Sequence, residues 1–94
     1  MYYVYLLQSL KDHTYYIGQT ENTDTRLHKH NQGQVRSTKA RVPWIMIGFE
    51  KYQTREESRW REYTLKNNYT EKKKFINTLT GFHSSTDRSQ PSEG

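Results

Sequence analysis

Apolar and aromatic residues gather in a few short segments of the chain, and polar stretches separate them. Residues 2–8 (YYVYLLQ) and 14–19 (TYYIGQ) combine β-branched, aromatic and aliphatic side chains, which is typical of strands. The short segment between them offers Asp12 as a turn residue, so the two strands are predicted to form an antiparallel hairpin. Residues 44–52 (WIMIGFEKY) are nearly continuously apolar and predict a third strand at the centre of the sheet.

A polar segment after the second strand carries the signals of a short helix. Asn22 or Thr23 can accept backbone N–H groups as the N-cap, and Asp24 suits the positive end of the helix dipole. Gly33 is placed to end the helix in a left-handed conformation. These signals predict a helix over residues 24–32.

Two further helices are predicted after the third strand. Thr54 and Glu57 form a capping-box pattern that opens a helix over residues 55–67. The side chains expected to face the core from this helix are those of Trp60, Thr64 and Leu65. Thr70 can cap a last helix that Gly81 ends. Its inward-facing side chains are expected to be those of Phe75, Ile76 and Leu79.

The predicted order of elements is β-β-α-β-α-α. This order indicates an α+β fold, in which helices flank a three-stranded antiparallel sheet. A chain of 94 residues is enough for one domain and not for two, so we expect a single domain over residues 1–81. Residues 82–94 are rich in serine and charge with almost no apolar side chain, which predicts a disordered tail.

The composition narrows the class of protein. The chain has no cysteine, which excludes disulfides, thiolate zinc sites and cysteine nucleophiles. Its first residues, MYYVYLLQSL, lack a charged leader, and no stretch is apolar enough to span a membrane, so a soluble cytoplasmic protein is expected. The net charge of +5 and the sequence pI near 9.5 suggest a polyanionic partner, most often nucleic acid.

Several residues with catalytic chemistry recur in a definite order along the chain. The first strand holds Tyr3-Val4-Tyr5 and the second holds Tyr16-Ile17-Gly18. Arg26 and His30 follow on one face of the next helix, in the segment TRLHKHN, and Glu62 follows on a later helix in ESRWREYTLK. This ordered set resembles the GIY-YIG nuclease superfamily, and in particular its small stand-alone, single-domain members. The similarity covers roughly residues 2–80, although the first motif has Tyr and Val where the family has Gly and Ile.

The resemblance implies a catalytic division of labour. One tyrosine would activate a water molecule, Arg26 would stabilise the transition state, and Glu62 would ligate a divalent metal, Mg²⁺ or Mn²⁺. The chemistry of these groups is suitable, because a carboxylate can hold a largely hydrated Mg²⁺ and a guanidinium offers a planar fork to phosphate. Tyrosine, with an ordinary pKa of about 10, needs help as a base, and either a nearby cation or His30 accepting its proton would provide it. The sequence does not decide whether Tyr5 or Tyr16 is the base.

Each of these residues also has a structural interpretation. Strand tyrosines usually pack, and an Arg and a His four residues apart usually lie on a solvated helix face. Glu62 stands four residues before Lys66, the spacing of a surface ion pair worth under about 1 kcal/mol. Gly18 marks either a bulge or a place where another group approaches closely.

Two basic segments could follow a phosphate backbone. The polar loop over residues 34–43 carries Arg36, Lys39 and Arg41, and the last predicted helix begins with the lysine run 72–74.

The sequence therefore favours a metal-dependent endonuclease that acts on DNA with little sequence specificity. The alternatives are a nucleic-acid-binding module of the same fold with weak or no catalysis, and a small protein-interaction domain. The oligomeric state is not set by the sequence, with a monomer favoured.

Overall fold

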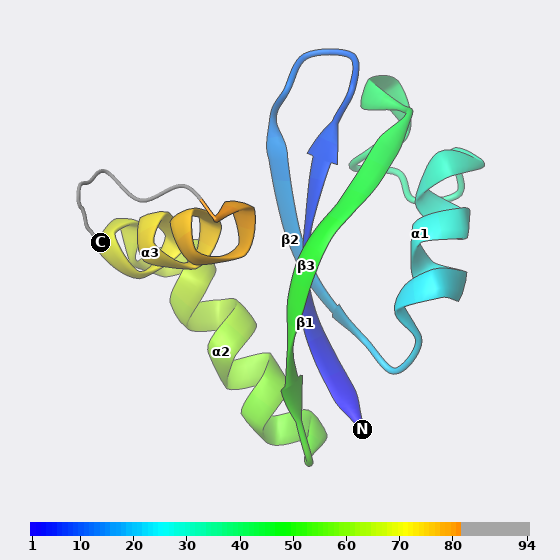
Figure 1. Ribbon diagram of the computed structural model, residues 1–94. Coiled ribbons are helices and arrows are strands. Elements are labelled where there is room, and N and C mark those ends of the chain that lie inside the picture. Colours follow the sequence, from blue (N-terminus) through cyan, green and yellow to red (C-terminus); the bar gives the residue numbers. More distant parts are fainter. Residues whose placement is uncertain (82–94) are drawn as a thin grey trace.

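The centre of the molecule is a three-stranded antiparallel sheet (Figure 1). The computed structural model describes residues 1–81. Its elements are, in chain order, β1 (Tyr2–Ser9), β2 (Tyr15–Thr20), α1 (Thr23–Asn31), the 3-10 turn η1 (Lys39–Arg41), β3 (Trp44–Tyr52), α2 (Arg55–Asn67) and α3 (Tyr69–Thr80). The predicted α+β fold and its order of elements are confirmed.

The central strand of the sheet is β1, in the order β2-β1-β3. The prediction that residues 44–52 form the central strand is therefore wrong. Four consecutive residues of β1, Val4 to Leu7, are buried on the two faces of the sheet, as a central strand requires. In β3 the side chains of Ile45 and Phe49 remain about 40% exposed, because β3 lies at an edge.

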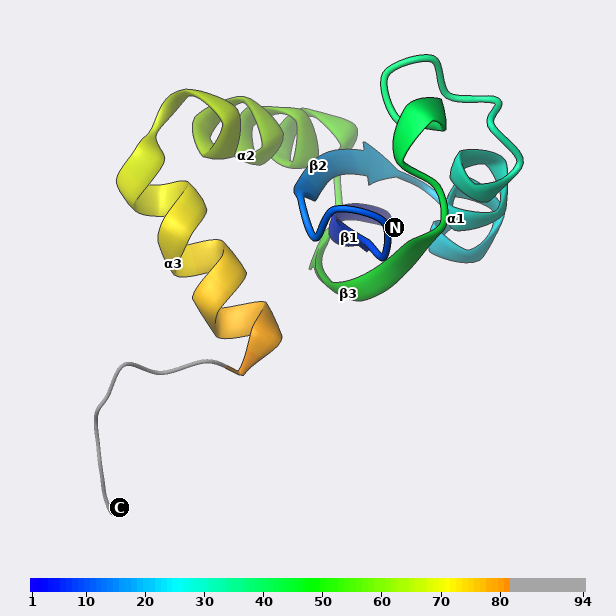
Figure 2. The same ribbon diagram turned by 90° about the horizontal axis from the view of Figure 1, so that it is seen from above.

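Helices cover the two faces of the sheet separately. Figures 1 and 2 show α1 and η1 on one side of the strands, and α2 and α3 on the other. Alternation along β1 divides the core accordingly, since successive side chains of a strand point to opposite faces. Val4 and Leu6 pack with residues of α2 and α3, whereas Tyr5 and Leu7 pack with Trp44 on the α1 side.

The predicted signals for the first two helices are present in the structure. Asn22, rather than Thr23, caps α1, and its side chain accepts the backbone N–H of Thr25. Gly33 follows α1 with a φ of 74°, in the left-handed region that favours glycine. The capping box of Thr54 and Glu57 opens α2 with both reciprocal hydrogen bonds in place.

The buried face of α2 differs from the predicted one at one residue. Ser58 and Leu65 are fully buried, but Trp60 is 69% exposed, so the prediction that Trp60 lies in the core is wrong. Two residues along a helix correspond to a rotation of about 200°, which directs Trp60 away from the face that Ser58 buries. Thr64 is half-buried. A small serine, not the large indole, therefore lies at the contact between α2 and the sheet.

The last helix, α3, begins earlier than predicted. Asn68 is its N-cap and accepts the backbone N–H of Glu71, so the assignment of the cap to Thr70 is wrong. The predicted inward face is confirmed: Phe75 is buried, and Ile76 and Leu79 pack against the same cluster.

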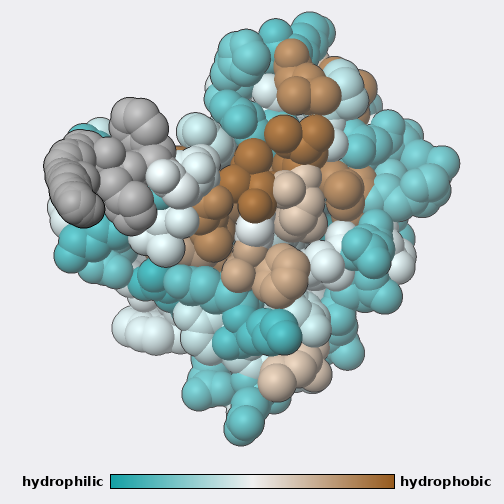
Figure 3. Space-filling view, in the orientation of Figure 1, coloured by the Kyte–Doolittle hydropathy of each residue, from teal (hydrophilic) through white to brown (hydrophobic). Residues whose placement is uncertain are grey.

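Apolar side chains are also visible at the surface over β3, between α3 and η1 (Figure 3). A hollow of about 690 Å³ lies between β3 and α3, and its apolar lining includes Met46, Ile47, Ile76 and Leu79. Among residues 1–81 no helix is long and apolar enough to cross a membrane. The predicted tail over residues 82–94 lies outside the described residues.

Candidate active site

Tyr5 lies at the centre of the α1 side of the sheet, directly opposite Gly18 on β2. A Cβ atom added to Gly18 would lie 2.6 Å from Cζ of Tyr5, closer than real Cβ contacts allow. Gly18 therefore leaves the space that the end of the Tyr5 ring occupies. It is a side chain, and not a neighbouring backbone, that approaches this glycine.

A chain of hydrogen bonds joins Tyr5 to α1 and to the following loop. The hydroxyl Oη of Tyr5 lies 2.9 Å from Nε2 of His30, and Nδ1 of His30 lies 2.7 Å from Oγ1 of Thr38. The Thr38 hydroxyl donates to the carbonyl of Val35 at 3.2 Å, so its oxygen is left to accept the Nδ1–H of His30. Nε2 of His30 then accepts the proton of Tyr5. Tyr5, His30 and Thr38 are all buried.

Burial sets the protonation states of this chain. Desolvation, together with the nearby charge of Arg26, lowers the pKa of His30 from the ordinary 6.5 to about 4, so the imidazole is neutral at neutral pH. Desolvation also raises the pKa of Tyr5 to about 12, against a smaller lowering by Arg26. The neighbouring Tyr16 and Glu62 are smaller causes of the raised pKa of Tyr5.

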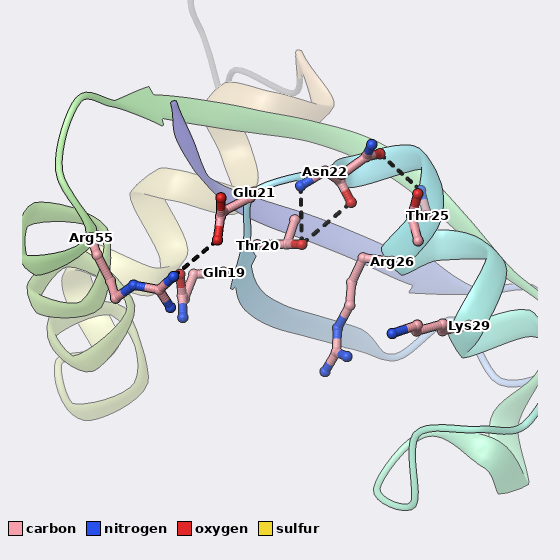
Figure 4. Close-up of a pocket in the computed structure, with 8 residues that line it drawn as sticks. All are labelled: Gln19, Thr20, Glu21, Asn22, Thr25, Arg26, Lys29 and Arg55. Carbon is pink, nitrogen blue, oxygen red and sulfur yellow. Dashed lines mark hydrogen bonds and ion pairs between the residues drawn. The ribbon is translucent and has the colours of Figure 1, made fainter.

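Arg26 connects Tyr5 to a cationic pocket. Its Nε donates to Oη of Tyr5 at 3.4 Å, and its guanidinium also lines a pocket of about 300 Å³ between β2, α1 and α2. Figure 4 shows Arg26 and Lys29 extending from α1 into this space, with Arg55 opposite them on α2. Arg55 is paired with Glu21 at 2.9 Å. The three cationic side chains and the one carboxylate give the pocket a net positive charge, which suits an anionic group such as phosphate.

Glu62 lies on α2 with its side chain 24% exposed. One of its oxygens, Oε2, is 2.9 Å from Nζ of Lys66, so the ion pair expected from the spacing is present. Within residues 1–81 no three His, Asp or Glu residues gather as a metal cluster. A metal held by Glu62 would need most of its ligands from water and substrate. Mg²⁺ accepts such a donor set, since it keeps several waters and commonly binds one carboxylate plus substrate phosphates.

Tyr16 is half-buried among other rings. Its ring centroid lies 5.1 Å from that of His30 and 6.2 Å from that of Trp44, both in edge-on geometry. Nζ of Lys66 lies 5.4 Å from the centre of the Tyr16 ring. Within residues 1–81 the Tyr16 hydroxyl makes no hydrogen bond, in contrast to that of Tyr5. The structure thus distinguishes the two tyrosines that the sequence left equivalent.

The basic segments lie on different sides of the sheet. Arg36 and Lys39 are exposed. They belong to the segment after α1, which lies on the same side of the sheet as α1 (Figure 1). Arg41 is paired with Asp12 at 3.2 Å, so part of its charge is already neutralised. The lysine run 72–74 belongs to α3 across the sheet and therefore lies apart from the loop.

Two supporting residues of the site escaped the sequence analysis. Thr38 orients His30, and its own carbonyl accepts the indole N–H of Trp44 at 3.0 Å. The Asn31 amide pairs with both backbone groups of Trp44, at 2.6 and 2.9 Å, and so fixes the end of α1 to β3. The only sequence signal was Asn31 in the segment TRLHKHN, next to His30. A threonine in a polar loop gives no signal at all.

The fold and this site define the class of protein. Residues 1–75 match the GIY-YIG catalytic domain, so the chain belongs to the GIY-YIG family, a nuclease superfamily, and nucleic acid is the substrate that this family implies. The chain is similar to the UPF0213 proteins of Staphylococcus aureus strains Mu50 and N315, with 36% identity over 74 residues, which are 78% of this chain and 88% of those proteins.

A solved structure supports the same family. The solution NMR structure of the UPF0213 protein BH0048 from Bacillus halodurans has a TM-score of 0.52 and 32% identity to this chain, and the match covers 86% of this chain and 87% of that one. The resemblance stated from the sequence is confirmed.

Proposed function

We propose that this protein is a metal-dependent endonuclease that hydrolyses phosphodiester bonds in DNA with little sequence specificity. The observation that carries the proposal is the hydrogen-bonded chain from Arg26 through Tyr5 to His30 and Thr38. A buried chain of this kind costs stability unless every member is satisfied, and it places a proton acceptor behind a tyrosine hydroxyl.

Tyr5 is the better of the two tyrosines for the role of base. As the attacking water loses a proton to Oη of Tyr5, the hydroxyl proton of Tyr5 passes to Nε2 of His30, and Tyr5 stays neutral throughout. Thr38 holds the imidazole in the tautomer that leaves Nε2 free to accept. With a pKa of about 4, His30 returns to the neutral form at neutral pH once the bond is cleaved, and the proton leaves to solvent.

Arg26 and Glu62 serve the phosphate. The guanidinium of Arg26, with Lys29 beside it in the pocket, would bind phosphoryl oxygens and offset the charge that develops on them. Glu62 would hold the divalent metal, Mg²⁺ or Mn²⁺, which supplies Lewis-acid stabilisation of the phosphoryl and leaving oxygens when bound. Arg36, Lys39 and Arg41 would contact further backbone phosphates. Such contacts bind strongly in low salt but read no bases, hence the low sequence specificity.

A second candidate function is nucleic-acid binding with weak or no catalysis. Its support comes from Tyr5, which is almost wholly buried and has a pKa raised to about 12. It also comes from Glu62, whose carboxylate is engaged by Lys66. The enzyme requires that substrate and metal replace the Lys66 contact and reach Oη, whereas the binding module does not.

The two functions are separated by nicking of supercoiled plasmid and of branched DNA with Mg²⁺, with Mn²⁺ and with EDTA. Glu62→Ala is expected to lower the metal-dependent rate about a thousandfold, the scale of a lost metal ligand. Glu56→Ala is the matched control, because it removes an exposed carboxylate from the same helix that forms no ion pair within residues 1–81.

Equal nicking by the wild type and Glu62→Ala would contradict the catalytic assignment. Salt-sensitive binding without cleavage in any metal would favour the binding module.

A further inference from the structure

The outer face of α2 carries two large aromatic side chains that no part of residues 1–81 covers. Trp60 is 69% exposed and Tyr63 is 59% exposed, and their rings are stacked on each other, with centroids 5.7 Å apart and planes 20° apart. We call this pair the α2 aromatic patch. The fold does not need it, since α2 contacts the sheet through Ser58 and Leu65 on its other side. Exposed aromatic area of this size is a mark of a binding surface.

Hollows flank the α2 aromatic patch and leave its edges accessible. One hollow, of about 470 Å³, is lined by Trp60, Tyr63, Arg59 and Glu56. Another, of about 330 Å³, borders Trp60 from the direction of Tyr52. A flat ligand that meets the indole therefore has room beside it.

The patch reaches the candidate active site around α2 by way of Tyr63 and Lys66. Tyr63 is the next residue after Glu62, and Lys66, the partner of Glu62, lies one turn further along α2 and over the ring of Tyr16. On the other side of the patch, Arg59 is exposed and forms no ion pair within residues 1–81. The aromatic rings are thus bordered by Arg59 and Lys66 as well as by Glu56. Tyr63 and Lys66 are i, i+3 neighbours on the surface of α2, so Lys66 links the patch to Glu62.

This combination fits a nucleic-acid strand with unpaired bases. Every nucleobase presents a flat face to an aromatic ring, and neighbouring Arg and Lys side chains follow the phosphates, which is how proteins hold single strands. Bases within a continuous duplex are already stacked on each other and offer no free face. Arg59 and Lys66 stand beside Tyr63, so the phosphates of such a strand would have cations to contact.

We propose that Trp60 and Tyr63 stack on unpaired bases of a single-stranded DNA segment next to the phosphate that Glu62 and Arg26 process. This inference rests on the proposed function, because it assigns the substrate class of the same site. The preferred substrate is then DNA with a single-stranded segment at or beside the cleaved bond, rather than continuous duplex.

Binding is measured with the full chain in EDTA, so that no cleavage occurs, by fluorescence anisotropy of a labelled single strand and of a blunt hairpin duplex with the same number of phosphates. Trp60→Ala and Tyr63→Ala are compared with Tyr69→Ala, which removes another exposed aromatic side chain, on α3. Trp60→Phe retains an aromatic face. Circular dichroism checks that each variant is folded.

The expected result is a single-strand affinity lowered about fivefold or more by Trp60→Ala and by Tyr63→Ala, with duplex affinity unchanged and most of the loss restored in Trp60→Phe. Tyr69→Ala retains both affinities. Intrinsic fluorescence should be quenched by the single strand and not by the duplex, since Trp60 is exposed while Trp44 is buried.

Equal losses of affinity for the single strand and the duplex would overturn the proposal. An unchanged affinity for the single strand would also overturn it and would point to a protein partner for the patch. Because cleavage is absent from the assay, failure of the proposed nuclease activity is recognised separately, in the plasmid experiment with metal.

Discussion

The site consists of two halves built in opposite ways. The inner half, formed by Tyr5, His30 and Thr38 between the sheet and α1, is buried and linked by two short hydrogen bonds. The outer half, formed by Glu62 and the α2 aromatic patch, is more exposed, and within residues 1–81 its only ion pair is the i, i+4 contact with Lys66. The inner half belongs to the core of the protein. Substitutions in the outer half are expected to change the free energy of unfolding little.

This difference separates positioning from recognition. A buried, fully satisfied network holds its groups in a single geometry, which suits proton transfer. An open helix face can exchange its contacts for metal and substrate at low cost, since an exposed ion pair contributes less than about 1 kcal/mol. Changes in the inner half are therefore expected to alter stability together with activity, and changes in the outer half to alter activity alone.

Protonation of His30 should give the largest effect on stability. Its pKa is about 4 in the folded protein and near 6.5 when unfolded, so the unfolded state binds the proton more readily. Stability from the neutral imidazole is fully present above pH 6.5 and is lost as pH falls towards 4, by on the order of 3 kcal/mol.

Chemical denaturation from pH 7 to pH 4 checks this expectation. His30→Gln should lose the steep slope between pH 6.5 and 4 even if it is less stable at pH 7. His28→Gln, at an exposed histidine of the same helix, should keep it. Parallel profiles for the wild type and His30→Gln would show that the inner half is not held by a neutral histidine.

Gly18→Ala tests the packing around Tyr5. The new Cβ would meet the end of the Tyr5 ring, which hydrogen bonds hold in place, so we expect a loss of about 1–3 kcal/mol in the free energy of unfolding. Nicking activity should fall as well, because Oη must move away from His30. Gly33→Ala serves as a contrast, since its added Cβ meets no atom closer than 3.7 Å and its cost comes only from the φ of 74°. Gly18→Ala with wild-type stability and activity would contradict the tight inner half.

Trp60→Ala should have the smallest effect on stability. At 69% exposure the indole contributes little to the core, so the free energy of unfolding should stay within about 0.5 kcal/mol of the wild type. Leu65→Ala, on the buried face of the same helix, should cost about 2–5 kcal/mol. Similar losses in the two variants would mean that the two faces of α2 are not distinct.

The sequence predicted most of the elements because their signals are local. The capping box of Thr54 and the glycine at position 33 act within a few residues, and the structure has both. The neighbour order of strands is not a local property, so the prediction that residues 44–52 rather than residues 2–8 form the central strand was wrong. The size of Trp60 suggested burial, but the phase of α2 is set by a serine that no hydrophobicity pattern marks.

The candidate site shows the same division. The order of Tyr5, Arg26, His30 and Glu62 pointed to a family, but it gave no contact among them. The link between Tyr5 and His30 spans 25 residues, and it depends on how α1 packs on the sheet. The role of Thr38 depends in addition on the path of a loop. Side-chain geometry of this kind is available only after folding, and it is what separates Tyr5 from Tyr16.

Comparison of Tyr5→Phe with Tyr16→Phe in the metal-dependent nicking assay tests the central claim most directly. Each change removes one hydroxyl and keeps the ring, but only that of Tyr5 is bonded to His30 and Arg26. The expected result is a rate at least about a hundredfold lower for Tyr5→Phe, the scale of a lost general base, with a smaller loss for Tyr16→Phe and both proteins folded. Wild-type nicking by Tyr5→Phe would contradict the assignment of Tyr5 as the base.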